Sequence, residues 1–214
     1  MKRLLLCALF MLGIYTNSYG LFVYKINYTN IKLVISNNFP KKGSLACCAN
    51  FTTDFKFYKS PEKRLVYSCT SNGTYYERKH PQKIGVFTYY NNKFRFGYDQ
   101  NQLIKASKNN GMGFLQWMVV YNYKPRKVKT FRSPQHFRVL AEINNELYFI
   151  EADPKLTIGD FTNELVKLKV KNAIYLDTGY GWETYYIKNS KNKRVYKHNT
   201  KHPFPFRTNF LVFE

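Results

Sequence analysis

Two asparagine pairs, each between short apolar segments, constrain the fold of this chain most strongly. Asn91-Asn92 separates the segments 84–90 and 93–97, and Asn144-Asn145 separates 138–143 and 147–151. Two short strand-like segments joined by a brief turn are typical of a β-hairpin. The chain is therefore expected to contain both hairpins and to belong to a fold in which strands predominate.

Other short apolar segments predict further strands. The last of them form another hairpin around a lysine-rich turn and a closing strand. Ser71-Asn72-Gly73-Thr74 follows one of the earlier segments and is a turn signal. The strands are expected at 33–36, 45–51, 55–58, 65–68, 115–121, 185–187, 194–196 and 210–213.

Two segments carry helical signals. A short helix is expected at 100–109, ended by Gly111. Thr157 is placed to cap a second helix, with Asp160 as the acid of a capping box. A strand at 173–176 follows, so strand, helix and strand form a crossover that is expected to join parallel strands. The sequence thus predicts an α+β domain, a strand-rich mixed sheet with two or three helices. The apolar face of the second helix consists of Ile158, Phe161, Leu165 and Leu168.

The strand at 173–176 ends at a carboxylate, Asp177, and a turn with two glycines, Gly179 and Gly181, follows. Carboxyl ends of strands often carry ligand-binding groups, and glycine permits a close approach of the backbone to a ligand. An equally simple interpretation is a strand followed by a tight turn that Asp177 caps. The local pattern leaves both interpretations open.

The first twenty residues have the pattern of a secretory signal. Lys2 and Arg3 precede an apolar centre at 4–14, and Ser18-Tyr19-Gly20 is a small-x-small cleavage site. The apolar centre is too short for a spanning helix of about 20 residues. We therefore expect a signal peptide at 1–20 and one exported domain at 21–214, secreted or periplasmic, without a transmembrane segment.

The net charge of +21 favours anionic partners, although a generally solvated basic surface would give the same composition. Nucleic acid is the least expected partner of an exported chain. Cys47, Cys48 and Cys69 allow one disulfide with one thiol left over. No cysteine or histidine spacing predicts a metal site, and the sequence identifies no cofactor.

Several segments together resemble the phosphodiester glycosidase family. These exported domains are related to the uncovering enzyme that exposes mannose 6-phosphate on lysosomal glycoproteins. The resemblance spans roughly residues 65–214 and is closest to short secreted bacterial members. The segments are Ser71-Asn-Gly-Thr-Tyr75, His136-Phe-Arg138 through 150, Leu156-Thr-Ile-Gly-Asp-Phe161, Ala173-Ile-Tyr-Leu-Asp177-Thr-Gly179 and Arg207-Thr-Asn209.

The resemblance implies a hydrolase that cleaves sugar-phosphodiester linkages. In that case Arg138 clamps phosphate oxygens, and Asp177 acts as base, nucleophile or metal ligand. Polar groups of the turns hydrogen-bond phosphate or sugar hydroxyls, and Trp182 stacks on a sugar ring. The structural alternatives are a surface cation at Arg138, a plain hairpin turn at Asn72-Gly73 and a core residue at Trp182. The expected substrate-binding residues are Asn72, Gly73, Gly179, Asn209 and Trp182.

One departure from the family pattern leaves a second function open. Thr178 stands where the family motif has its first glycine, and a β-branched residue resists the positive φ that glycine accepts. The alternative is a non-catalytic module that binds phosphorylated or other anionic glycans through its basic, aromatic surface.

Overall fold

The chain divides into two compact units. The first comprises Met1–Ile26 and Val119–Tyr175, and the second comprises Asn27–Met118 and Leu176–Glu214. The prediction of one domain at 21–214 remains a prediction. The computed structural model describes residues 14–16, 20–36, 38–40, 42–49, 51, 60–79, 83–152, 154–178, 185–188, 194–197 and 209–214.

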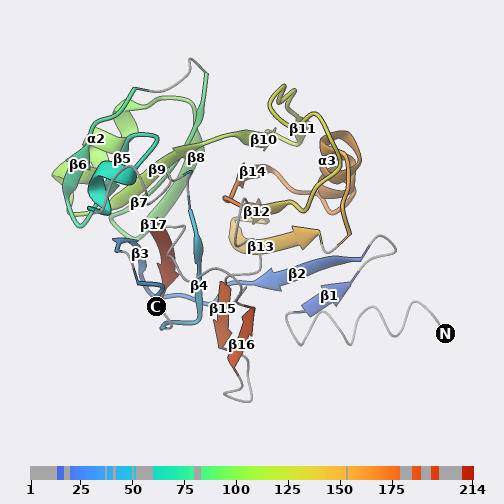
Figure 1. Cartoon of the computed structure of the whole chain (residues 1–214), viewed down its shortest axis with the longest axis horizontal. Helices are drawn as coiled ribbons and strands as arrows, with labels where there is room; N and C mark the ends of the chain where they lie inside the picture. Colours follow the sequence, from blue (N-terminus) through green and yellow to red (C-terminus); the bar gives the residue numbers. More distant parts are fainter. Residues whose placement is uncertain are drawn as a thin grey trace. The chain divides into compact units, whose positions relative to one another are not determined.

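The first unit contains a seven-stranded sheet. Its strands are β1 (Ile14–Thr16), β2 (Leu21–Lys25), β10 (Met118–Tyr121), β11 (Lys124–Pro125), β12 (Arg138–Ile143), β13 (Glu146–Ala152) and β14 (Asn172–Tyr175). They lie in the order β1-β2-β13-β12-β14-β10-β11. The helix α3 (Ile158–Lys167) lies beside β11 (Figure 1).

An aromatic cluster packs α3 onto this unit. The rings of Phe137 and Phe161 stack with their centroids 5.1 Å apart, and Phe131 lies 4.8 Å from Tyr175. The predicted cap is confirmed, because the Asp160 N–H donates to Thr157 Oγ1 at 3.1 Å. Satisfying a free N–H at the first turn fixes where the helix begins.

The second unit contains two five-stranded sheets. One has the order β16-β15-β4-β17-β3 and the other β6-β5-β9-β7-β8. The strands of the first are β3 (Ile31–Ile35), β4 (Leu45–Cys48), β15 (Tyr185–Lys188), β16 (Arg194–Lys197) and β17 (Asn209–Phe213). Those of the second are β5 (Cys69–Ser71), β6 (Thr74–Tyr76), β7 (Gly85–Tyr90), β8 (Lys93–Gly97) and β9 (Met112–Gln116).

The helix α2 (Asn101–Lys108) packs against β5, β7 and β9 (Figure 1). Leu103 from α2 joins a fully buried cluster with Ile84, Val86 and Leu115. A single 3-10 turn, η1 (Glu62–Arg64), precedes β5. The predicted helix at 100–109 is confirmed.

The predicted mixed sheet is wrong. The described strands form three antiparallel sheets, and the α-helices of the described residues are α2 and α3. β12 is antiparallel to both of its neighbours, β13 and β14. β13 and β14 therefore run in the same direction, but β12 lies between them, so the connection through α3 joins strands that do not pair. The hairpin at Asn144-Asn145 places β12 beside β13. The strand-helix-strand pattern of the sequence does not show that β12 also lies between β13 and β14.

The two asparagine-pair hairpins are confirmed, because β7 pairs with β8 and β12 with β13. Asn91, Asn92, Asn144 and Asn145 all have φ between 51° and 61°, the left-handed region that asparagine tolerates better than most residues.

Some predicted strands differ from the structure. The strand expected at 45–51 is β4, which ends at Cys48, and no strand forms at 65–68, because β5 begins only at Cys69. The strand expected at 115–121 is two strands, β9 and β10, which are separated at Trp117 and belong to different sheets. The strand expected at 55–58 lies outside the described residues.

Cys47, Cys48 and Cys69 are buried, and the disulfide that composition allowed does not join any two of these described residues. Burial raises the pKa of the Cys69 thiol to about 12. Neither α2 nor α3 has the length and apolar content that a membrane-crossing helix needs, and these are the α-helices of the described chain.

Gly43 gives a direct test of how β17 ends. Its φ is +78°, and an added Cβ would overlap the carbonyl oxygen of Phe213, which also accepts the N–H of Ser44 at 2.7 Å. We expect Gly43→Ala to lower the free energy of unfolding by more than about 1 kcal/mol, measured by urea denaturation. Gly97→Ala is the matched control, because its Cβ would meet no atom closer than 4.0 Å. Equal stability of both variants would contradict this packing.

Candidate functional site

Asp177 lies two residues beyond β14, in the second unit. Its side chain is buried, with an exposed fraction of 2% for the residue. Its backbone N–H donates to the carbonyl oxygen of Ala49 at 3.0 Å. The backbone of Asp177 is therefore held at the end of β4, because Ala49 directly follows that strand.

Asn209, the first residue of β17, lies at the same place. It is 1% exposed, and its carbonyl oxygen accepts the N–H of Ala49 at 3.1 Å. Ala49 thus uses its N–H for Asn209 and its carbonyl for Asp177. The structure brings these two predicted site residues together at one residue of the second unit, although they are 32 positions apart in the sequence.

Arg138 belongs to the first unit and is fully buried, so its interpretation as a surface cation is wrong. It lies directly opposite Glu151 in the β12–β13 ladder. Its Nε and Nη2 donate to Glu151 Oε2 at 2.8 Å and 2.5 Å, and its guanidinium lies 5.4 Å from the ring centre of Phe149. Charge-assisted bonds of this kind fix the plane of the guanidinium.

Asn72 and Gly73 form the turn between β5 and β6. Asn72 is exposed with φ 47°, and Gly73 has φ 76°. The Gly73 N–H donates to the Gly111 carbonyl at 3.3 Å, and its own carbonyl accepts the hydroxyl of Ser107. These contacts attach the turn to the C-terminal end of α2, as the simple turn interpretation requires.

Gly179 and Trp182 lie outside the described residues. Thr178 is described and buried, and it is not among the described residues that have positive φ. Threonine therefore occupies this position in a conformation that is ordinary for an L-residue.

The burial of two polar residues of the second unit was not predicted from the sequence. Arg64 at the end of η1 is fully buried, and so is Gln116 at the end of β9. Gln116 Oε1 accepts the N–H of Trp117 at 2.9 Å, whereas its Nε2 has no hydrogen-bond partner in the described chain. Arg64 follows Pro-Glu-Lys, which looks like a solvated turn, so no local signal indicated its burial.

Aromatic contacts connect these residues to the neighbourhood of Ala49. The carbonyl of Phe51 accepts the N–H of Val66, which lies two positions after Arg64. The centres of the Phe51 and Tyr67 rings are 5.8 Å apart. Tyr67 and Trp117 pack against the same buried cluster beneath α2. Burial raises the pKa of Tyr67. Asp177, Asn209 and Gln116 are all buried, and the segment that follows Ala49 contacts this aromatic region through Phe51.

Within the part of the chain that the structure describes, no three histidine, cysteine or acidic side chains are grouped so that they could hold a metal ion. The chemistry that these residues offer is that of a carboxylate, amides and a buried guanidinium. A carboxylate can accept a proton, while amides and guanidinium can donate hydrogen bonds to phosphate or hydroxyl oxygens.

Comparisons with known proteins give a structural likeness only. No protein-family model matches the sequence, and no curated protein matches it. The fold is similar to the catalytic domain of zebrafish N-acetylglucosamine-1-phosphodiester alpha-N-acetylglucosaminidase, in a structure auto-inhibited by its pro-peptide. The TM-score is 0.65 at 12% identity, over 94% of this chain and 80% of that one.

A hypothetical protein from Synechocystis is also similar, with a TM-score of 0.60 and 10% identity over 90% of this chain and 58% of that one. Identities this low show the fold alone. The chain therefore has a fold like that of a phosphodiester glycosidase catalytic domain.

The buried Arg138–Glu151 pair predicts a strong energetic coupling. Removing one partner leaves the other charge buried, so Arg138→Met and Glu151→Leu should each destabilise the protein by roughly 3–5 kcal/mol. The double variant should lose much less than the sum, because neither charge then remains. Urea denaturation of the four proteins measures the coupling, and additive losses would contradict it.

Proposed function

We propose that this protein is an exported hydrolase that cleaves sugar-phosphodiester linkages in glycans. The observation that carries the proposal is the arrangement at Ala49, where the backbones of two buried polar residues, Asp177 and Asn209, bond to one residue in a fold like that of a phosphodiester glycosidase. The name of the zebrafish enzyme, an N-acetylglucosamine-1-phosphodiester glycosidase, supplies the substrate class. Export rests on the pattern of the first twenty residues.

In this proposal Asp177 is the catalytic residue. It removes a proton from the attacking water, which splits the bond between sugar C1 and the phosphate oxygen and leaves a free sugar and a phosphate monoester. Its burial strengthens its interactions with charge, because little water competes for it. The Asn209 amide donates to a hydroxyl or phosphate oxygen. Gly179 supplies a backbone N–H at the turn after Asp177, and Trp182 supplies a face for the sugar ring.

Each unit also contains a buried arginine to which we assign a role in binding phosphate. In the first unit, the role implied for Arg138 is phosphate binding, with Glu151 as the residue that orients its guanidinium. In the second unit, Arg64 is a buried cation that can balance the charge of a phosphate. The Asn72-Gly73 turn, which follows the end of β5, is proposed to bind substrate through its exposed polar groups.

The second candidate function is non-catalytic binding of an anionic glycan. Thr178 favours it, because this residue replaces a glycine of the family motif directly after the proposed catalytic carboxylate. The two candidates differ in a simple observable. A binding module retains the ligand unchanged, whereas a hydrolase releases sugar.

The test uses an N-acetylglucosamine-1-phosphate alkyl diester and measures release of free N-acetylglucosamine. We expect turnover by the wild type and a loss of about 10²-fold or more in kcat/KM for Asp177→Asn, because the amide cannot accept the proton. Asp99→Asn is the matched control, since Asp99 is an exposed carboxylate that accepts the N–H of Asn101 just before α2. Its activity should remain at the wild-type level.

Two outcomes contradict the hydrolase. If neither wild type nor Asp177→Asn turns over the diester but both bind it, the binding module is the correct function. If Asp177→Asn retains full activity with an unchanged melting temperature, catalysis occurs elsewhere in the chain.

A further inference from the structure

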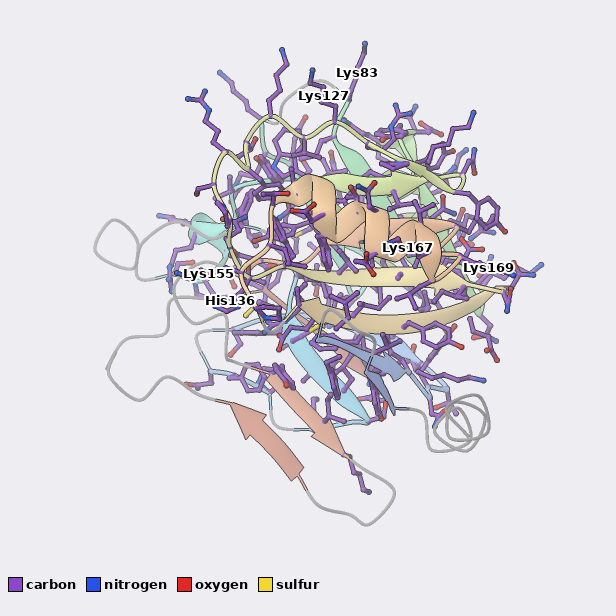
Figure 2. The ribbon with its side chains drawn as sticks, turned by 90° about the vertical axis from the view of Figure 1, so that its right-hand side faces the viewer. Lys83, Lys127, His136, Lys155, Lys167 and Lys169 are labelled. Carbon is purple, nitrogen blue, oxygen red and sulfur yellow. The ribbon has the colours of Figure 1, made fainter. Side chains whose placement is uncertain are left out.

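The longest exposed basic segment of the first unit includes β11 and leads to β12. We define the basic loop as residues 122–136. It contains no aspartate or glutamate, and its five cations are all exposed: Lys124, Arg126, Lys127, Lys129 and Arg132. In Figure 2 Lys127 projects away from the ribbon. Five positive charges in nine residues repel one another unless an anion balances them.

The acids of the first unit that the structure describes are engaged outside this loop. Glu142 accepts from Lys171 and Asn172, Glu146 from Lys25, Glu151 from Arg138, and Glu164 from Lys167. Asp160 is bonded to Thr157 at the start of α3. Each of these described carboxylates therefore has a partner outside the basic loop.

Apolar anchors hold the loop in place between its charges. Val128 is buried between Lys127 and Lys129, and the Phe131 ring contacts Phe137 at 5.3 Å. The Arg126 N–H donates to the Val119 carbonyl at 2.9 Å. Gln135 and Leu156 exchange two backbone hydrogen bonds, of 2.9 and 3.0 Å, which fix the far end. The inward direction of these apolar groups leaves the cationic side chains facing solvent.

One aromatic ring is exposed at the start of the loop. Tyr123 is 55% exposed, and its N–H donates to the Lys171 carbonyl at 2.8 Å, which fixes its backbone in a left-handed conformation of φ 62°. A ring held beside Lys124 presents a flat apolar face next to a positive charge. This combination suits a sugar ring that carries a phosphate.

We propose that the basic loop is a binding surface for a polysaccharide whose sugars are joined through phosphates. Arginine and lysine bind the phosphates, and Tyr123 stacks on a sugar. A membrane surface is less suitable, because Val128 and Phe131 point inward and Tyr123 is the one large apolar side chain of the loop that is exposed to insert. Binding of single-stranded nucleic acid would need several exposed aromatic rings, whereas Tyr123 is the one ring of this loop that is strongly exposed. The choice of polymer rests on the proposed function, whereas the binding of polyanions by this loop does not.

The test measures binding of a mannose-1-phosphate polymer at low and physiological salt, with unphosphorylated mannan as the uncharged control. The loop variant changes Lys124, Arg126, Lys127, Lys129 and Arg132 to Gln. The charge-matched variant changes Lys63, Lys79, Lys83, Lys93 and Lys108 to Gln, five exposed lysines of the second unit. We expect the loop variant to lose at least about tenfold in affinity and most of the salt dependence, and the matched variant to keep both.

Two further measurements complete the test. Tyr123→Ala should weaken binding of the polymer but not of inorganic polyphosphate, which has no sugar to stack on the ring. Hydrolysis of the small diester by the loop variant should equal that of the wild type. If the small diester is never hydrolysed but the loop variant alone loses polymer binding, the hydrolase proposal fails and the polyanion surface stands.

Several results would overturn the proposal. Equal losses in the loop and matched variants would show that only net charge matters. Tighter binding of single-stranded DNA or of anionic phospholipid vesicles than of the polymer would assign the loop to another partner. If the loop variant does not fold, judged by its melting temperature, the double variant Lys127→Gln, Lys129→Gln replaces it, and unchanged binding by that variant also overturns the proposal.

Discussion

The two backbone hydrogen bonds of Ala49 are the interaction on which the candidate site depends. They extend the β4–β17 pairing by one residue and attach the segment after β14 to it. Each bond uses main-chain atoms, so it holds Asp177 and Asn209 whatever their side chains bind. Both residues are almost fully buried, and under the proposed function this fixed backbone arrangement provides the preorganisation that charge stabilisation in catalysis requires.

Charge is used in two opposite ways in this chain. Inside the first unit, Arg138 and Glu151 neutralise each other across neighbouring strands, and burial makes their separation costly. On the surface of the same unit, the basic loop gathers cations without a carboxylate of its own. Part of the net charge of +21 is concentrated on this anchored loop, and it is there that we propose an anionic polymer binds.

Features that depend on neighbouring residues could be predicted from the sequence, whereas the pairing of strands far apart in the chain could not. Asn91-Asn92 and the Thr157 cap act within a few residues, so the hairpin and the helix start could be recognised. Which strands pair depends on contacts far apart in the chain, so three antiparallel sheets appeared as one mixed sheet. Asp177 was marked by the strand end before it, whereas Arg64 and Gln116 resemble surface residues until the fold buries them.

A nuclear magnetic resonance titration with N-acetylglucosamine 1-phosphate tests the central claim most directly. If the arrangement at Ala49 is the ligand site, the backbone amide resonances of Ala49, Asp177 and Asn209 shift together in a saturable manner. Resonances of distant turns, such as Asn91 in the hairpin of β7 and β8, remain unchanged. Saturable shifts confined to other residues, with those three amides unaffected, would contradict the account.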